Sequence, residues 1–270
     1  MSYYEEYRPA GFNYLPPVIK NLLIINILVF LGQQVLEGRF GINLDEQFAL
    51  FHYSSPFFHL YQYITYMFLH GGFSHIFFNM FALWMFGNVL ENIWGSKRFL
   101  VYYFVTGLGA AIIHTIYFSY KIYSIEDAAA VYALSPGIEE FEIFIREQVP
   151  AYYKSIFTEL LDHWYAQPGN PGFIDESKYI INLFIEKERN IPTVGASGAV
   201  FGLLLAFGML LPNTVIYLYF AIPIKAKYFV IIYGAVELFL GVSSGGDNIA
   251  HFAHLGGMLF GFLFIKYWSK

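Results

Sequence analysis

The stretch Gly195-Ala196-Ser197-Gly198-Ala199-Val200-Phe201-Gly202 combines small residues with a single hydroxyl group at the start of an apolar segment. Small residues let neighbouring helices approach closely, so the pair Gly198 and Gly202 alone indicates helix packing without chemistry. The same small residues would also let other side chains reach the hydroxyl of Ser197. Ser197 is therefore a candidate nucleophile if a base accompanies it.

Two further apolar segments carry polar side chains that suit chemistry at Ser197. His75 and Asn79 are four residues apart, so both project from one face of a helix. His254 lies in Ala253-His254-Leu255-Gly256-Gly257, near the start of another apolar run. A serine hydroxyl needs a base, and a neutral imidazole suits that role at physiological pH. We predict Ser197 as nucleophile and His254 as general base and acid. The predicted oxyanion donors are Asn79, His75 and the Ser197 backbone N–H.

Carboxylates play no part in this predicted site. None stands at a spacing that obviously orients His254, so the prediction is a Ser–His dyad. Glu237 lies inside an apolar segment, where an ionisable group is a functional candidate by default. We assign it no catalytic role, because a hydrogen-bonded structural carboxyl explains it at least as well.

The composition indicates that a lipid bilayer is the solvent for much of the chain. Hydrophobic residues make up 57% of it and charged residues 13%, which is about half the charged fraction of a typical soluble domain. The net charge of −5 argues against a nucleic-acid partner. Because the chain has no cysteine, disulfides and thiolate metal sites are excluded. We expect no metal or other cofactor.

Hydropathy divides the chain into four parts. Residues 1–19 are a polar N-terminal tail, residues 20–120 carry three spanning helices, residues 121–190 form a soluble insertion, and residues 191–270 carry three more spans. An aromatic-rich interfacial loop occupies residues 36–73. The six spans are predicted at residues 20–35, 74–93, 99–118, 194–211, 228–242 and 249–268.

The insertion at residues 121–190 holds twelve acidic and six basic residues, so it cannot be embedded in lipid. Amphipathic helices are predicted at residues 138–164, bent at Pro150, and at residues 176–188, with a turn-rich connector at residues 167–172. Because the insertion would emerge beside the predicted site, we expect it to cover the site or to filter access.

Basic residues near the membrane set the predicted orientation. They occur in the two tails and in the loops after spans two and four, which places these segments in the cytoplasm: Arg8, Lys20, Lys97, Arg98, Lys225, Lys227, Lys266 and Lys270. Spans two, four and six then all begin at the opposite face, and each carries its polar residue within its first two turns. At 1.5 Å per residue these side chains lie roughly 5 to 10 Å below that face, at one depth.

The three polar helix starts together resemble the rhomboid family of intramembrane serine proteases. The resemblance rests on Gly195-Ala196-Ser197-Gly198, on His70-Gly71-Gly72-Phe73-Ser74-His75 followed by Asn79, and on Ala253-His254-Leu255-Gly256-Gly257 followed by Gly261. It implies an all-α membrane protein, a six-transmembrane-helix rhomboid-like bundle with a soluble helical insertion between helices 3 and 4.

The resemblance also implies supporting roles around the dyad. Phe201 would pack against the His254 ring, His70 matches a structural loop histidine, and Glu91 matches a carboxylate that ties helices together. Some family members carry a Trp-Arg pair in the first external loop, where this chain has Tyr61-Gln62. The implied supporting residues are Gly195, Gly198, Phe201, His70 and Gly257.

The expected activity is hydrolysis of a peptide bond in or next to the transmembrane helix of a single-pass membrane protein, with membrane lipid as the surroundings. The compact form with six spans favours a bacterial inner membrane, with a multi-pass chain and a cytoplasmic N-terminus. The main alternative is a catalytically silent relative that binds transmembrane clients without cutting them.

Other interpretations carry less weight. His251 and His254 could form a metal pair, but few carboxylates are near them in sequence. His114, with His75 or His254, could ligate a haem, although a buried hydrogen-bonded histidine explains it better. A transporter is disfavoured because no inverted repeat is visible. The pair Gly257 and Gly261 indicates packing of span six against span four.

Overall fold

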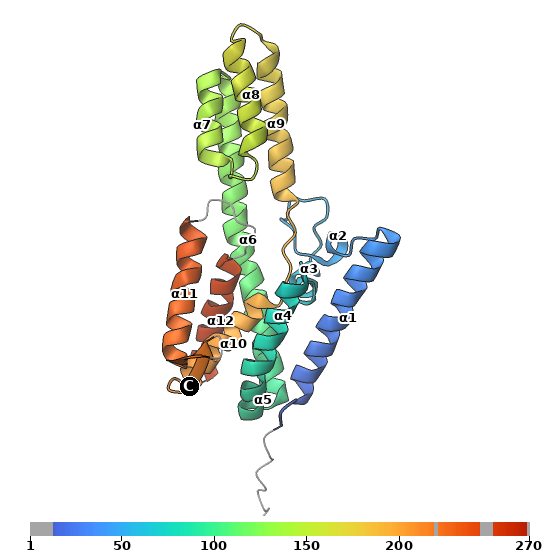
Figure 1. The fold of residues 1–270 in the computed structure, drawn as a ribbon, viewed down its shortest axis with the longest axis vertical. Coiled ribbons are helices and arrows are strands. Elements are labelled where there is room, and N and C mark those ends of the chain that lie inside the picture. Colours follow the sequence, from blue (N-terminus) through green and yellow to red (C-terminus); the bar gives the residue numbers. More distant parts are fainter. Residues whose placement is uncertain (1–12, 219–220, 244–250, 269–270) are drawn as a thin grey trace, which may run out of the picture.

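The computed structural model describes residues 13–218, 221–243 and 251–268, and helices dominate this part of the chain (Figure 1). Most of the predicted N-terminal tail and the start of the predicted sixth span lie outside these residues. The long helices of the bundle are α1 (Pro17–Phe40), α4 (Phe73–Ala82) continued by η2 (Leu83–Gly87) and α5 (Asn88–Trp94), α6 (Ser96–Leu134), α10 (Ser197–Leu210), α11 (Ala226–Ser243) and α12 (His251–Trp268).

Three helices among the described residues are long and apolar enough to cross a membrane. They are Pro17–Phe40, Phe73–Trp94 and Ser96–Leu134. α10 is apolar but has only 14 residues. The predicted count of six spans therefore stays a prediction, while an apolar helical bundle of membrane-spanning length is observed.

The first span is longer than predicted, and the second contains an irregular turn. α1 continues past residue 35 to Phe40 and ends at Gly41, whose φ of 65° is the left-handed conformation that glycine adopts easily. The predicted loop at residues 36–73 therefore starts later, and it contains the short helices α2 (Asp45–Phe48), α3 (Gln62–Thr65) and η1 (Tyr66–Phe68). Within span two, η2 is a π-helical turn that the sequence did not indicate.

α6 joins the predicted span three to the predicted insertion in one continuous helix. The predicted span ends at residue 118, but the helix continues without a break to Leu134. Its 39 residues correspond to about 58 Å, roughly twice the hydrocarbon thickness of a bilayer. Lys121 and Glu126 do not interrupt the helix, because both are good helix formers. Lys121 pairs with Glu188 and Glu126 with Arg189, both on α9 (Gly172–Arg189). The charges mark where the helix can leave lipid.

The rest of the predicted insertion is a set of helices built on the outer half of α6. The single helix predicted at residues 138–164 is two helices, α7 (Ile138–Gln148) and α8 (Lys154–Ala166), because Pro150 lacks an N–H and holds Val149 in an extended conformation. Buried aromatic side chains form their shared core: Phe141, Phe144, Phe157, Trp164 and Phe184.

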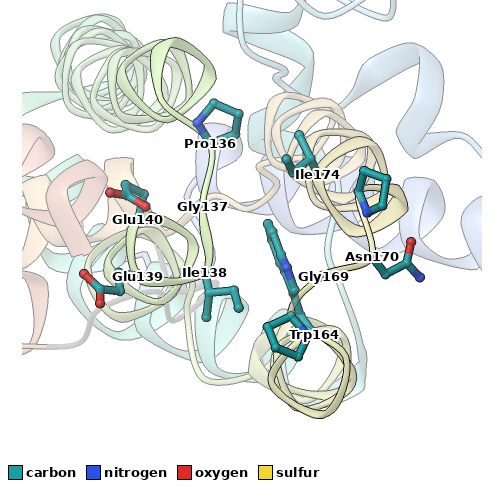
Figure 2. A pocket seen from close by; sticks show the side chains of 11 residues that line it. Pro136, Gly137, Ile138, Glu139, Glu140, Trp164, Gly169, Asn170 and Ile174 are labelled. Atoms are coloured by element: carbon teal, nitrogen blue, oxygen red, sulfur yellow. The ribbon is translucent and has the colours of Figure 1, made fainter.

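These outer helices extend away from the bundle. Figure 1 shows α7, α8 and α9 rising along α6 instead of folding back across α10 and α12. The expectation that this segment covers the predicted site or filters access to it stays a prediction. A pocket of about 440 Å³ lies at the outer end of these helices. Figure 2 shows Trp164, Ile138 and Ile174 among the residues that line it, near the turn at Asn170.

A small sheet replaces the interfacial piece expected between spans four and five. β1 (Val215–Leu218) and β2 (Ile222–Lys225) pair antiparallel, with Tyr217 opposite Pro223. The strands bring the end of α10 back to the start of α11, and the N–H of Ala226 donates to the carbonyl of Thr214 at 2.8 Å.

Glycines allow α6, α10 and α12 to pack at backbone distance. A Cβ on Gly257 would collide with the carbonyl oxygen of Gly198, so α12 touches the backbone of α10 there. A Cβ on Gly202 would lie 2.6 Å from Thr106 of α6. A Cβ on Gly261 would collide with the hydroxyl of Tyr102 of α6, which itself donates to the carbonyl of Gly202 of α10.

Glu91, on α5, joins three helices at the end of the bundle where α1 and α6 begin. Its carboxylate accepts hydrogen bonds from the backbone N–H groups of Val18 (3.0 Å) and Ile19 (2.9 Å) in the first turn of α1, and from the Ser96 hydroxyl (2.6 Å) at the start of α6. First-turn N–H groups have no partner within their own helix, and a carboxylate there also favours the helix dipole. The helix-tying role implied for Glu91 is confirmed.

Glu91→Gln should lower the free energy of unfolding by about 1.5 to 3 kcal/mol, because an amide cannot accept hydrogen bonds at both oxygen positions. Ser96→Ala removes one donor and should cost about 1 kcal/mol. Reversible unfolding of the purified protein in mixed micelles measures both values. A Glu91→Gln protein as stable as the wild type would contradict this role.

Gly257→Ala should lower the thermal unfolding midpoint, because the added methyl group forces α12 away from the Gly198 carbonyl, a strain worth about 1 to 3 kcal/mol. Gly32→Ala on α1 is the matched control, since nothing lies within 4 Å of a Cβ at that position. If both variants melt at the same temperature, the backbone contact between α10 and α12 does not determine thermal stability.

Candidate active site

Ser197 is the first residue of α10, and the turn before it is shaped by Gly195. Gly195 has a φ of 124°, which favours glycine, and its N–H donates to the carbonyl of Tyr66 at 2.9 Å. A Cβ at Gly195 would lie 2.7 Å from Nε2 of His75 and 3.7 Å from Oγ of Ser197. The missing side chain therefore leaves room for the His75 ring beside the serine hydroxyl.

Ser197 and His254 form a hydrogen-bonded pair. Oγ of Ser197 lies 2.8 Å from Nε2 of His254, which comes from the first turn of α12. The backbone contact between Gly198 and Gly257 holds these two helix starts together. The structure thus brings together the two residues that the sequence predicts as nucleophile and base.

The His254 ring is held on one face by an aromatic side chain. Phe201, one turn after Ser197 on α10, stacks on it with ring centroids 4.1 Å apart and an angle of 5° between the planes. Only 12% of the His254 side chain is exposed. The packing of Phe201 implied by the resemblance is confirmed, and it limits rotation of the imidazole.

Glu237 is the residue that the sequence-based prediction missed. Its Oε2 lies 2.9 Å from Nδ1 of His254, on the side of the ring opposite Ser197, and 2.8 Å from Nδ1 of His251. Spacing in the sequence placed no carboxylate obviously beside His254, whereas the structure places Glu237 there. The available signal was an ionisable residue within an apolar segment, but spacing along the chain does not reveal which helix such a residue faces.

α11 presents Glu237 from a narrow buried stripe. Most large side chains of this helix are exposed on the surface of the bundle, while Ala226, Val230 and Glu237 are buried. A Cβ on Gly241, one turn later, would lie 3.2 Å from the His251 Cβ. The stripe follows the spacing of one helix face and directs the carboxylate to the start of α12.

Two of the three predicted oxyanion donors, Asn79 and His75, lie on α4. Asn79 is buried, and its Nδ2 donates to the carbonyl of His75 one turn earlier at 3.0 Å. Nδ1 of His75 accepts the N–H of Gly71 at 3.3 Å. His70 is buried in the loop before α4 and contacts the edge of the His75 ring, with ring centroids 5.1 Å apart. Burial lowers the pKa of His70 to about 3, so this ring is neutral at physiological pH.

The metal and haem interpretations fit the geometry less well than hydrogen bonding does. Glu237, His251 and His254 each offer a ligand atom, and these atoms lie within 4.8 Å of one another. Both imidazoles already reach the carboxylate at hydrogen-bonding distance, so an ion would have to displace these bonds. Nε2 of His114 lies 2.8 Å from the Thr193 hydroxyl, as expected for a structural histidine.

Comparison with known proteins gives two consistent findings. The family model described as the Rhomboid domain matches residues 58–135 and 172–270. The chain is 25% identical over 240 residues to RHOMBOID-like protein 12, mitochondrial, from Arabidopsis thaliana, an alignment that covers 89% of this chain and 55% of that protein. The chain thus spans about half the length of this relative. Because the family model covers well over half of the chain, including α4, α10, α11 and α12, this protein belongs to the rhomboid family.

Proposed function

We propose that this protein is an intramembrane serine endopeptidase that hydrolyses a peptide bond in or next to a substrate's transmembrane helix. The observation that carries the proposal is the distance of 2.8 Å between Ser197 Oγ and His254 Nε2, with Phe201 stacked on the imidazole. Membership of the rhomboid family supports it, since the pair lies within the matched residues. A catalytically silent client-binding protein would need neither a hydroxyl nor an imidazole at these positions.

The first half of the reaction forms an acyl-enzyme. Nε2 of His254 takes the Ser197 proton while Oγ bonds to the substrate carbonyl carbon, and the carbonyl electron pair becomes the oxyanion. When the carbonyl reforms, the C–N bond breaks and His254 returns the proton to the leaving amine. Water then repeats these steps on the ester, which releases a carboxylic acid and restores both side chains.

The oxyanion needs donors on the side of Ser197 that faces α4. The Ser197 N–H belongs to the first turn of α10, where backbone N–H groups have no partner within the helix and the helix dipole favours negative charge. Asn79 and His75 complete the proposed set, provided that Asn79 exchanges its present bond to the His75 carbonyl for one to the oxyanion. No cofactor takes part in these steps.

The substrate must expose a carbonyl that an intact helix keeps hydrogen-bonded. We therefore propose single-pass membrane proteins with small or helix-breaking residues near the extracytoplasmic boundary as substrates. The chain would cross the membrane six times with its N-terminus in the cytoplasm, in a bacterial inner membrane. The three candidate spans and the apolar helix α10 support a membrane location.

A fluorophosphonate probe should label wild-type protein on Ser197 in detergent or bilayers. Ser197→Ala should remove the adduct, and His254→Ala should slow labelling by at least about a thousandfold, because the base is lost. Mass spectrometry of the modified peptide measures both effects. Folded wild-type protein that neither labels nor cleaves a transmembrane peptide would favour client binding without catalysis.

Asn79→Ala should lower kcat by about a hundred- to a thousandfold and change KM little, because it removes a donor that acts mainly in the transition state. Asn92→Ala on α5 is the matched control; its amide contacts Asn13 and Asn88 at the other end of the helix. Steady-state cleavage of a fluorogenic transmembrane peptide gives both constants. Equal kcat for the two variants would remove Asn79 from the proposed oxyanion site.

A further inference from the structure

We propose that Glu237 is a positioning residue that fixes the tautomer and orientation of His254, and that His251 holds the carboxylate in place. This inference rests on the proposed function and deepens it. The dyad becomes a chain from carboxylate to imidazole to hydroxyl, contributed by α11, α12 and α10 in turn.

The tautomer follows from which atoms can donate. An ionised carboxylate only accepts hydrogen bonds, and a neutral imidazole carries one N–H. Because Nδ1 of His254 lies 2.9 Å from Oε2 of Glu237, the ring proton is on Nδ1. Nε2 then keeps its lone pair and points it at the Ser197 hydroxyl, 2.8 Å away. This is the form that can accept the serine proton.

Without Glu237 the opposite tautomer becomes competitive. His254 could then place its proton on Nε2 and donate it to Ser197 Oγ, in which form it cannot act as the base. The carboxylate also faces the positive charge that His254 gains during the reaction. Charge separation is expensive in a surrounding of low polarity, so a fixed negative charge in contact with the ring stabilises this state.

His251 explains why the carboxylate is held at this point. Its Nδ1 lies 2.8 Å from the same Oε2, and the residue is three positions before His254 on the same helix. Both His251 and Glu237 are buried, at 5% and 7% exposure. Two N–H donors from one helix therefore clamp one oxygen from the next, which limits movement of the carboxylate.

The decisive variant is Glu237→Met, which keeps the side-chain length and removes the negative charge and both carboxylate oxygens. We expect fluorophosphonate labelling of Ser197 to slow by about a hundred- to ten-thousandfold, while KM for a transmembrane peptide changes by less than about threefold. Leu238→Met, at a neighbouring exposed position of α11, should label at the wild-type rate. Glu91→Gln should be less stable but label at the wild-type rate per folded molecule. Wild-type labelling of Glu237→Met would overturn the inference.

A second measurement does not depend on activity. Nitrogen-15 NMR of histidine-labelled protein in bilayers reports which ring nitrogen of His254 is protonated, with the signal assigned by loss in His254→Ala. We expect protonation at Nδ1 in the wild type and at Nε2 in Glu237→Met. An Nε2-protonated wild type, or an unchanged tautomer in the variant, would overturn the inference. If Ser197 never labels but the tautomer still depends on Glu237, the proposed protease activity fails and the positioning role stands.

Discussion

The contact between the backbones of α10 and α12 is the constraint on which the site depends. No side chain separates Gly257 from the carbonyl of Gly198, so the two helices meet at a distance that any larger residue would prevent. Ser197 stands one residue before the first of these glycines, and His254 three residues before the second. Their hydrogen bond is thus a consequence of helix packing, made by residues that carry no chemistry themselves.

Much of this site could be predicted from the sequence because its signals are local. Small residues and the start of an apolar segment accompany each of Ser197, His75 and His254. This pattern can be recognised without any knowledge of the packing. Glu237 could not be assigned in the same way. Its role depends on which face of α11 is buried and on which helix that face meets, and both are properties of the packed bundle.

The same distinction explains the success and failure of the fold prediction. Apolar segments indicated the long helices to within a few residues, since hydropathy reports what lipid or a core must cover. Hydropathy did not indicate that the helix of span three continues into the predicted insertion, because it reports where apolar residues stop and not where a helix ends. Lys121 and Glu126 form ion pairs with α9. α6 therefore continues as one helix, on which the outer helices pack. The strands β1 and β2 were missed because four-residue segments carry too little periodicity.

Glu91 and Glu237 show how partners decide what a buried carboxylate does. Both interrupt apolar segments, and both bind donors from neighbouring helices. Glu91 accepts backbone N–H groups and a hydroxyl, which neither gain nor lose protons under ordinary conditions, so its contribution is confined to stability. Glu237 accepts from imidazoles, whose proton can move between two nitrogens and whose charge can change. A carboxylate with such partners controls a chemical state as well as a position, and this difference can be recognised only once the donors are known.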